Sequence, residues 1–154
     1  MKSLEEIDEL RRKVRQDLDL RVNENANTPE KHILVCGGTG CTSSKSPVII
    51  ENLNKALKEN NITNVKVIQT GCFGLCAKGP IVIVRPEDVF YALVKPEDAE
   101  EIVNSHIKEG KIVERLLCKD IDESVVKKLD ELNFYKKQIN SCNNTIKFYI
   151  CFSC

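Results

Sequence analysis

Hydrophobic positions in the N-terminal segment repeat every three or four residues. Between residues 3 and 22 they are Leu4, Ile7, Leu10, Val14 and Leu18. This spacing places one apolar stripe along a helix. Ser3 and Glu6 form the S-x-x-E pattern that caps a helix N-terminus. We expect the stripe to pack on the helix's own domain; a docking helix for a partner subunit is the alternative.

Strand and helix patterns then alternate through the central part of the chain. The expected elements are a strand at 32–35 ending at Cys36, a helix from Pro47 to Asn60, a strand at 65–69, strands at 80–85 and 89–94 joined by a turn at 86–88, and a helix from Pro96 to Gly110. Proline suits the first turn of a helix, where its missing N–H has no helical partner. The order β-α-β-β-β-α predicts an α/β domain, a sheet of about four strands with helices on one or both faces. This outline is similar to the thioredoxin-like fold.

The flanking segments have a different character. Residues 1–30 hold the N-terminal helix and a polar linker, residues 31–118 the α/β domain, and residues 119–138 a linker helix through Leu132, capped by Asp120 with Glu123. Residues 139–154 contain one charged side chain and no clear period, so they stay an unassigned tail. The abrupt change in composition is consistent with a truncated or frameshifted end.

Composition narrows the class of protein. The 154 residues carry 23 basic and 23 acidic side chains, with no net charge. Without a basic excess, neither nucleic acid nor an anionic membrane is expected as a partner. The expected partners are proteins. No apolar run approaches the roughly 18 residues of a membrane span, and the N-terminus is acidic where a signal peptide would be basic and then apolar. We expect a cytoplasmic protein.

The 8 cysteines are the candidate chemistry, because thiols in a reducing cytosol are more typical of metal or redox sites than of structural disulfides. Cys36 and Cys41 flank GGTG, and Cys72 and Cys76 flank FGL. Each pair follows a predicted strand. Loops at one end of a parallel or mixed sheet converge, so the two pairs could bring four thiolates together.

Three kinds of site use such thiols. Structural zinc accepts four thiolates, but most often with two-residue spacers. A disulfide-exchange enzyme normally has C-x-x-C at the start of a helix, which neither pair shows. A [2Fe–2S] cluster takes two cysteines per iron in longer loops, whose backbone N–H groups face the sulfur. Glycines let the backbone approach closely, and both loops contain them: Gly37, Gly38, Gly40, Gly71 and Gly74. The cluster is the favoured occupant.

Neighbouring residues add less. Gly38 and Gly40 fit the first two positions of G-x-G-x-x-G, but Ser43 occupies the third, so a nucleotide loop is not expected. Phe73 and Leu75 would shield the cluster from water.

The remaining candidates have structural interpretations. Lys78 is expected to be a solvated loop charge, with an electrostatic effect on the cluster as the alternative. Cys118 is expected to be a small buried hydrophobe. No regular frame surrounds the last three cysteines, Cys142, Cys151 and Cys154, so a second metal site is not expected. Neither histidine, His32 or His106, is expected to be a ligand.

The segments VCGGTGCTSSKSP and QTGCFGLCAKGPIVIV resemble the thioredoxin-like [2Fe–2S] ferredoxin domain. Such domains occur at the N-terminus of the flavoprotein (diaphorase) subunit of NAD(P)-linked iron hydrogenases, in smaller partner subunits, and in the NADH-oxidising module of respiratory complex I. The resemblance covers residues 31–118. It implies that Cys36, Cys41, Cys72 and Cys76 bind a [2Fe–2S] cluster.

The same resemblance implies one-electron transfer. The expected partners are other subunits of a hydrogenase or NADH dehydrogenase complex, or a soluble ferredoxin. In the hydrogenase flavoproteins a linker and a domain for FMN and NAD(P)H follow; here residues 133–138 resemble the linker, and the resemblance ends there. We therefore expect no catalysis from this chain alone. A zinc-stabilised interaction module without redox activity is the alternative function.

Overall fold

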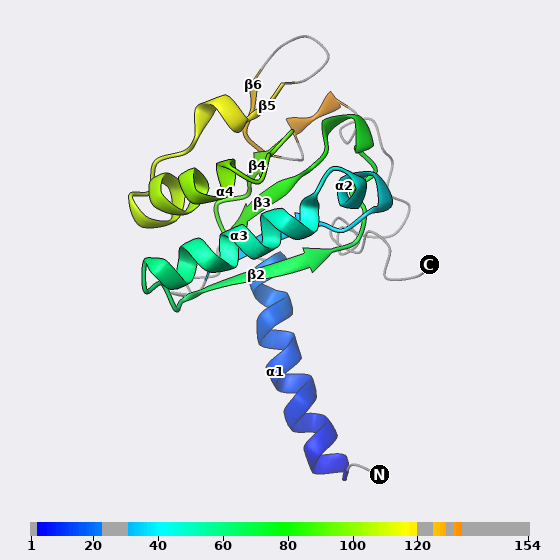
Figure 1. Ribbon diagram of the computed structural model, residues 1–154. Helices are drawn as coiled ribbons and strands as arrows, with labels where there is room; N and C mark the ends of the chain where they lie inside the picture. Colours follow the sequence, from blue (N-terminus) through cyan, green and yellow to red (C-terminus); the bar gives the residue numbers. More distant parts are fainter. Residues whose placement is uncertain (1–2, 23–30, 120–124, 129–130, 134–154) are drawn as a thin grey trace.

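The computed structural model describes residues 3–22, 31–119, 125–128 and 131–133, and its centre is a four-stranded sheet (Figure 1). The strands are β1 (Lys31–Cys36), β2 (Val65–Thr70), β3 (Val82–Arg85) and β4 (Val89–Tyr91). Their order is β2-β1-β3-β4, with β1 parallel to β2 and antiparallel to β3. The predicted α/β fold class is confirmed.

One face of the sheet is covered by helices. The helix α3 (Ser46–Glu59) carries its proline in the first turn, as predicted. The short helix α4 (Asp98–Glu101) continues as the π-helix η2 (Ile102–Lys108). Buried side chains from these helices meet Ile33 and Val35 of β1 in the larger core. Side chains alternate across a strand, so Leu34 and Cys36 face the opposite side.

That opposite face carries a second core, which includes part of the candidate site. Cys36, Cys41 and Cys118 are buried there with Phe90 of β4. Phe73 and Leu75 pack against its edge. Because both faces of the sheet are covered, every residue of β1 from His32 to Cys36 is buried, and residues 33–36 form an uninterrupted apolar run.

Three elements of the central domain differ from the prediction. The glycine-rich loop after β1 contains a five-residue helix, α2 (Thr39–Ser43). Strand β4 ends at Tyr91 rather than continuing to residue 94. The helix expected from Pro96 begins at Asp98 and widens into η2, ending before Gly110, whose φ of +71° suits a helix terminator.

The predicted helix at residues 120–132 is wrong at Val125–Val126. These two residues form strand β6, which pairs antiparallel with β5 (Cys118–Lys119). The next residue, Lys127, accepts a hydrogen bond from the Phe90 N–H at 2.8 Å. Val126 is buried and Val125 exposed, which is a strand's alternation. Backbone pairing with the domain therefore prevailed over the local capping pattern.

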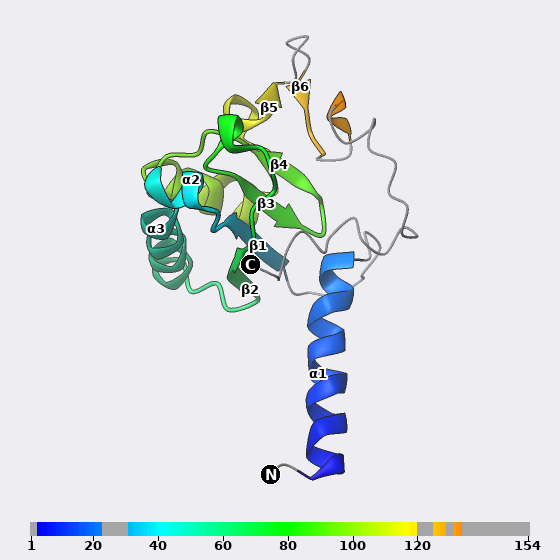
Figure 2. The same cartoon turned by 90° about the vertical axis from the view of Figure 1, so that its right-hand side faces the viewer.

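The helix α1 (Leu4–Val22) has the predicted capping box: Ser3 Oγ accepts from Glu6 N–H at 3.2 Å, and Glu6 Oε2 accepts from Ser3 N–H at 2.9 Å. It extends away from the sheet (Figures 1 and 2). The apolar stripe is exposed at Leu4 (82%), Ile7 (49%), Leu10 (42%) and Val14 (52%). The prediction that it packs on its own domain is wrong for these four residues.

The predicted linker at 23–30 and the tail at 139–154 lie outside the described residues. Among the described helices, none combines the length and the apolar composition needed to cross a membrane.

Candidate metal centre

The two cysteine-bearing loops leave the same edge of the sheet. Strands β1 and β2 are parallel, and Cys36 at the end of β1 lies opposite Thr70 at the end of β2. The Gly37 N–H donates to the Thr70 carbonyl at 2.9 Å. The loop that carries Cys41 and the loop that carries Cys72 therefore start side by side, as the strand pattern predicted.

Both thiols of the first pair are buried, Cys36 at the end of β1 and Cys41 in α2. Cys36 is 1% exposed and Cys41 2% exposed. The two thiols are close enough for Cys36 to raise the pKa of Cys41. Thr42 N–H donates to the Gly38 carbonyl at 2.9 Å, closing the helical turn that directs Cys41 into the core. Glycine-rich loops carry no periodic apolar pattern, so this short helix had no signal in the sequence.

The second pair lies nearer to solvent. Cys72 is half-buried and Cys76 is exposed, and the two thiols are close enough for Cys72 to raise the pKa of Cys76. Gly74 has a φ of +77°, and its N–H donates to Cys72 Sγ at 3.3 Å. Glycine adopts a positive φ without steric cost, and this backbone conformation directs the Gly74 N–H to the sulfur of Cys72.

Close packing between the loops explains two other glycines. A Cβ on Gly38 would lie 3.0 Å from Cys72 Sγ, and one on Gly79 would lie 2.6 Å from Cys41 Sγ. A Cβ on Gly40 would be in ordinary contact with Cys76, at 3.6 and 3.7 Å. The loops thus bring the four cysteines into one neighbourhood. Gly79 was not among the predicted residues, because it follows the second pair and nothing in its spacing links it to Cys41.

The thiols also affect each other's ionisation. Burial raises the pKa of Cys41 to about 12, and its hydrogen bond with Cys36 and the charges of Cys36 and Cys72 act in the same direction. The pKa of Cys76 is raised by its hydrogen bond with Cys72 and by the charge of Cys72, with a smaller contribution from Cys36. With their pKa values raised, the Cys41 and Cys76 thiols hold protons unless a cation replaces them, which is how metal ligation releases protons.

This donor set fits a two-iron cluster. The described residues contain no group of three or more His, Cys, Asp or Glu side chains arranged around a single metal ion. A [2Fe–2S] cluster needs only two thiolates at each iron, and the site consists of two cysteine pairs on closely packed loops.

Cys118, the two histidines and Lys78 agree only in part with the roles expected from the sequence. Cys118 is fully buried in the second core, as predicted. Both histidines are buried, and His106 Nδ1 lies 2.8 Å from the Tyr91 hydroxyl. Lys78 is more than a solvated charge, because its Nζ donates to the Lys119 carbonyl at 2.7 Å and ties the second loop to β5.

A sequence profile of the thioredoxin-like [2Fe-2S] ferredoxin family matches residues 21–106. The chain belongs to this family. A [2Fe–2S] ferredoxin from Clostridium pasteurianum is 42% identical to this ferredoxin over 97 residues, which cover 57% of this chain and 95% of the relative. One from Aquifex aeolicus is 51% identical over 51 residues, covering 33% of this chain and 46% of the relative.

Solved structures agree with this membership. The structure of a thioredoxin-like [2Fe–2S] ferredoxin from Aquifex aeolicus has a TM-score of 0.52 and 34% identity to this ferredoxin, covering 56% of this chain and 88% of its own. A second structure of that protein, of the wild type, has the same TM-score and identity and is covered to 94%. The thioredoxin-like fold predicted from strand order is confirmed.

Proposed function

We propose that this ferredoxin is a one-electron carrier whose [2Fe–2S] cluster is bound by Cys36, Cys41, Cys72 and Cys76. The observation that carries the proposal is the meeting of two thiol pairs between loops in van der Waals contact. The relatives support it: two solved variants of the Aquifex aeolicus ferredoxin replace cysteines four positions apart, the spacing of Cys72 and Cys76.

In this proposal each cysteine pair would bind one iron. Cys36 and Cys41 would hold the buried iron, and Cys72 and Cys76 the iron nearer to solvent. The cluster supplies a single-electron couple shared by the two metals. An electron would cross the surface at the Cys76 edge, because the other pair is enclosed by the second core.

The chain's own groups tune this site. Gly74 N–H, already directed at Cys72 Sγ, would stabilise the extra negative charge of the reduced state. Phe73 and Leu75 pack on the second core beside Cys36 and Cys41, which limits access of water to the buried pair.

The physiological context is a further part of the proposal. The chain would act as the ferredoxin part of an NAD(P)-linked hydrogenase or an NADH dehydrogenase, exchanging electrons with a flavin-bearing subunit or a soluble ferredoxin in the cytoplasm. Its resemblance to the N-terminal domain of hydrogenase flavoproteins supports this context. The chain would form and break no covalent bonds of a substrate.

Anaerobic purification tests the cluster. Iron and sulfide analysis should give about two of each per chain, with visible absorbance and an EPR signal after reduction. Cys72→Ser should lose or disorder the cluster, while Cys118→Ala should keep the spectrum, since Cys118 lies in β5, outside the two cysteine-bearing loops. Zinc without iron would discard the proposal in favour of the interaction module.

A separate assay tests the carrier role. Purified chain with a full cluster should not reduce dyes at the expense of NADH. It should do so only when a flavin-bearing NADH-oxidising subunit is added. NADH-dependent dye reduction by the chain alone would contradict the carrier assignment while leaving the cluster assignment intact.

A further inference from the structure

An open groove of about 650 Å³ begins two residues after Cys76. Lys78 and Leu93 lie at this end, joined by a backbone hydrogen bond from Leu93 N–H to the Lys78 carbonyl at 2.9 Å. Lys95 and Lys119 continue the lining. We call the surface formed by these four residues the lysine groove. Lys78 places one end of this groove two residues along the chain from the exposed Cys76.

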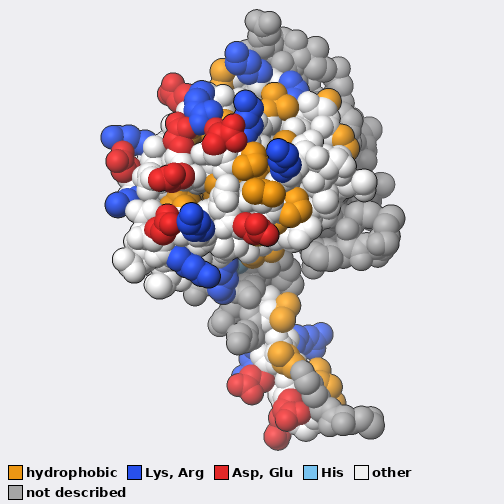
Figure 3. All heavy atoms as spheres, in the orientation of Figure 1, with side chains coloured by type: hydrophobic (Ala, Val, Ile, Leu, Met, Phe, Trp, Pro, Cys, Tyr) orange, Lys and Arg blue, Asp and Glu red, His pale blue; other side chains and the backbone are white. Residues whose placement is uncertain are grey.

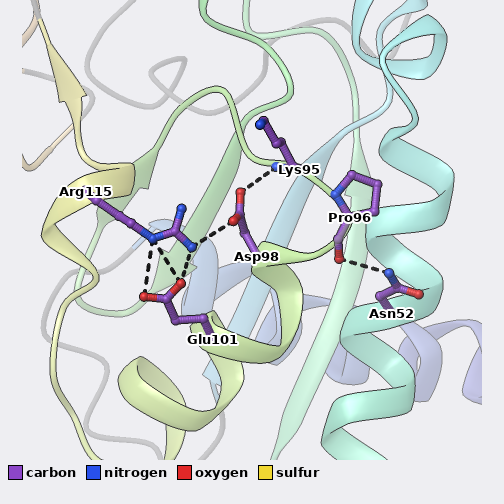
Figure 4. A network of polar contacts seen from close by, with 6 residues as sticks. All are labelled: Asn52, Lys95, Pro96, Asp98, Glu101 and Arg115. Carbon is purple, nitrogen blue, oxygen red and sulfur yellow. Dashed lines mark hydrogen bonds and ion pairs between the residues drawn. The ribbon is translucent and has the colours of Figure 1, made fainter.

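The lysine groove carries a local excess of positive charge. Of the other charged lining residues, Asp98 and Arg115 neutralise each other: Arg115 donates to Asp98 Oδ1 at 2.7 Å and also pairs with Glu101 (Figure 4). The second oxygen, Asp98 Oδ2, accepts from the Lys95 N–H at 2.8 Å. Three lysines then face one remaining acid, Glu97. Within the described residues no ion pair neutralises the ammonium group of Lys95 or Lys119.

Leu93 is unusual for two independent reasons. It is 58% exposed, and its φ of +52° lies in the left-handed region. That region is unfavourable for a residue with a branched side chain, and such strain often marks a functional surface. Basic, acidic and hydrophobic side chains lie together on the face shown in Figure 3. An apolar centre with a charged rim is the usual anatomy of a protein interface.

We propose that the lysine groove is the docking surface for an acidic electron-exchanging protein, with Leu93 as its apolar contact. Docking there would bring the partner's redox centre to the Cys76 edge. Charge complementarity identifies the occupant, because the groove is basic in a chain with no net charge. The proposal rests on the proposed electron transfer for its purpose, but binding itself requires no electron.

Two proteins of opposite charge test the docking. Acidic cytochrome b5 and basic cytochrome c are titrated as oxidised proteins into the oxidised ferredoxin by calorimetry, and stopped flow then measures their reduction by the reduced ferredoxin. At low salt, cytochrome b5 should bind and react faster, and the rate should fall as NaCl screens the field. Because the chain has no net charge, its overall electrostatic attraction for an acidic protein is weak. A decrease of the rate with salt would therefore come from charges on the docking surface itself.

Charge reversal locates the surface. Lys95→Glu with Lys119→Glu should lower the rate with cytochrome b5 by about tenfold or more at low salt and abolish its salt dependence. Lys111→Glu is the matched control, because Lys111 is an exposed lysine outside the groove, and it should leave both unchanged. If the double variant and the control change the rate equally, the proposal is overturned. It is also overturned if the ferredoxin forms a dimer that only the double variant dissociates, because the groove would then bind a second copy of the chain.

The variant Leu93→Asn distinguishes an effect on partner binding from an effect on protein stability. Asparagine tolerates the left-handed backbone, so the variant should unfold at a midpoint about 2 °C higher or more, with an unchanged cluster spectrum. It should nevertheless bind cytochrome b5 about fivefold more weakly or worse. Unchanged binding would remove Leu93 from the interface. A failure of the cluster assignment gives a different result: the protein contains no iron and transfers no electron. The differences in cytochrome b5 binding between these variants would still be measured by calorimetry.

Discussion

At the scale of single residues, Gly38 and Gly40 of the loop between Cys36 and Cys41 differ in what a side chain would contact. A Cβ at Gly38 would press on the Cβ of Cys72 at 2.9 Å, whereas a Cβ at Gly40 has ordinary contacts with Cys76. We expect Gly38→Ala to lower the iron content and the visible absorbance per chain, because the Cys72 thiol must shift. Gly40→Ala should keep both, and should favour α2 by up to about 1 kcal/mol.

The comparison of these two variants has a clear contrary outcome. If Gly40→Ala loses iron as severely as Gly38→Ala, the glycines provide clearance for the cluster itself rather than for the Cys72 side chain. Iron and sulfide analysis of both variants, purified anaerobically in parallel, distinguishes the two explanations.

Another residue-scale prediction concerns the buried pair of Tyr91 and His106. The Tyr91 hydroxyl accepts from the Val113 N–H at 3.2 Å and lies 2.8 Å from His106 Nδ1, to which it can donate. Burial lowers the pKa of His106, while the charge of Glu87 opposes this shift and that of Lys31 assists it. The folded protein thus binds a proton at His106 less readily than the unfolded chain does.

The sign of the pH effect follows. Stability from His106 is complete above its unfolded pKa of about 6.5 and decreases as the pH falls from there toward the lower folded value, by at most about 1.4 kcal/mol per pH unit. Urea unfolding between pH 8 and pH 5 measures this. His106→Gln keeps an acceptor for Tyr91 without a titrating ring, so its free energy of unfolding should depend less on pH; identical slopes would contradict the prediction.

At the scale of elements, α1 is a helix whose described apolar residues contact little of the chain. Replacing Leu4, Ile7 and Leu10 together by Gln should change the free energy of unfolding by less than about 0.5 kcal/mol, since exposed side chains contribute little. Chemical unfolding measures the effect. Ser3→Ala, which removes the cap acceptor of Glu6 N–H, is the contrasting variant and should lower α1 helicity in circular dichroism.

A large loss of stability in the triple Gln variant would show that α1 does pack its stripe on the domain in solution. No loss would leave the stripe free for a partner subunit, which is the alternative that the sequence pattern left open.

At the scale of the whole molecule, the proposed cluster joins the loop after β1, with Cys41, to the loop after β2, with Cys72 and Cys76. Removing iron should therefore lower the thermal midpoint, because a group that binds only the folded state stabilises it. Without iron, the buried Cys41 must be accommodated as a protonated thiol, because burial raises its pKa.

Thermal unfolding before and after anaerobic chelation measures this stabilisation. The Cys72→Ser variant should already have a midpoint close to that of the iron-depleted wild type, and chelation should lower it little further. A wild-type midpoint that is indifferent to iron would mean that the two loops are held together by the protein alone.

Sequence by itself determined the order of strands and helices, the two thiol pairs and the capping box of α1. These are local properties: apolar periodicity, glycine and proline positions and cysteine spacing depend on neighbours a few residues away. Tertiary structure alone decided that Val125–Val126 forms a strand, that Gly79 packs on Cys41, that Leu93 is strained and exposed beside Lys95, and that the stripe of α1 faces solvent. Each depends on contacts or free surface between segments far apart in the chain, which no local pattern encodes.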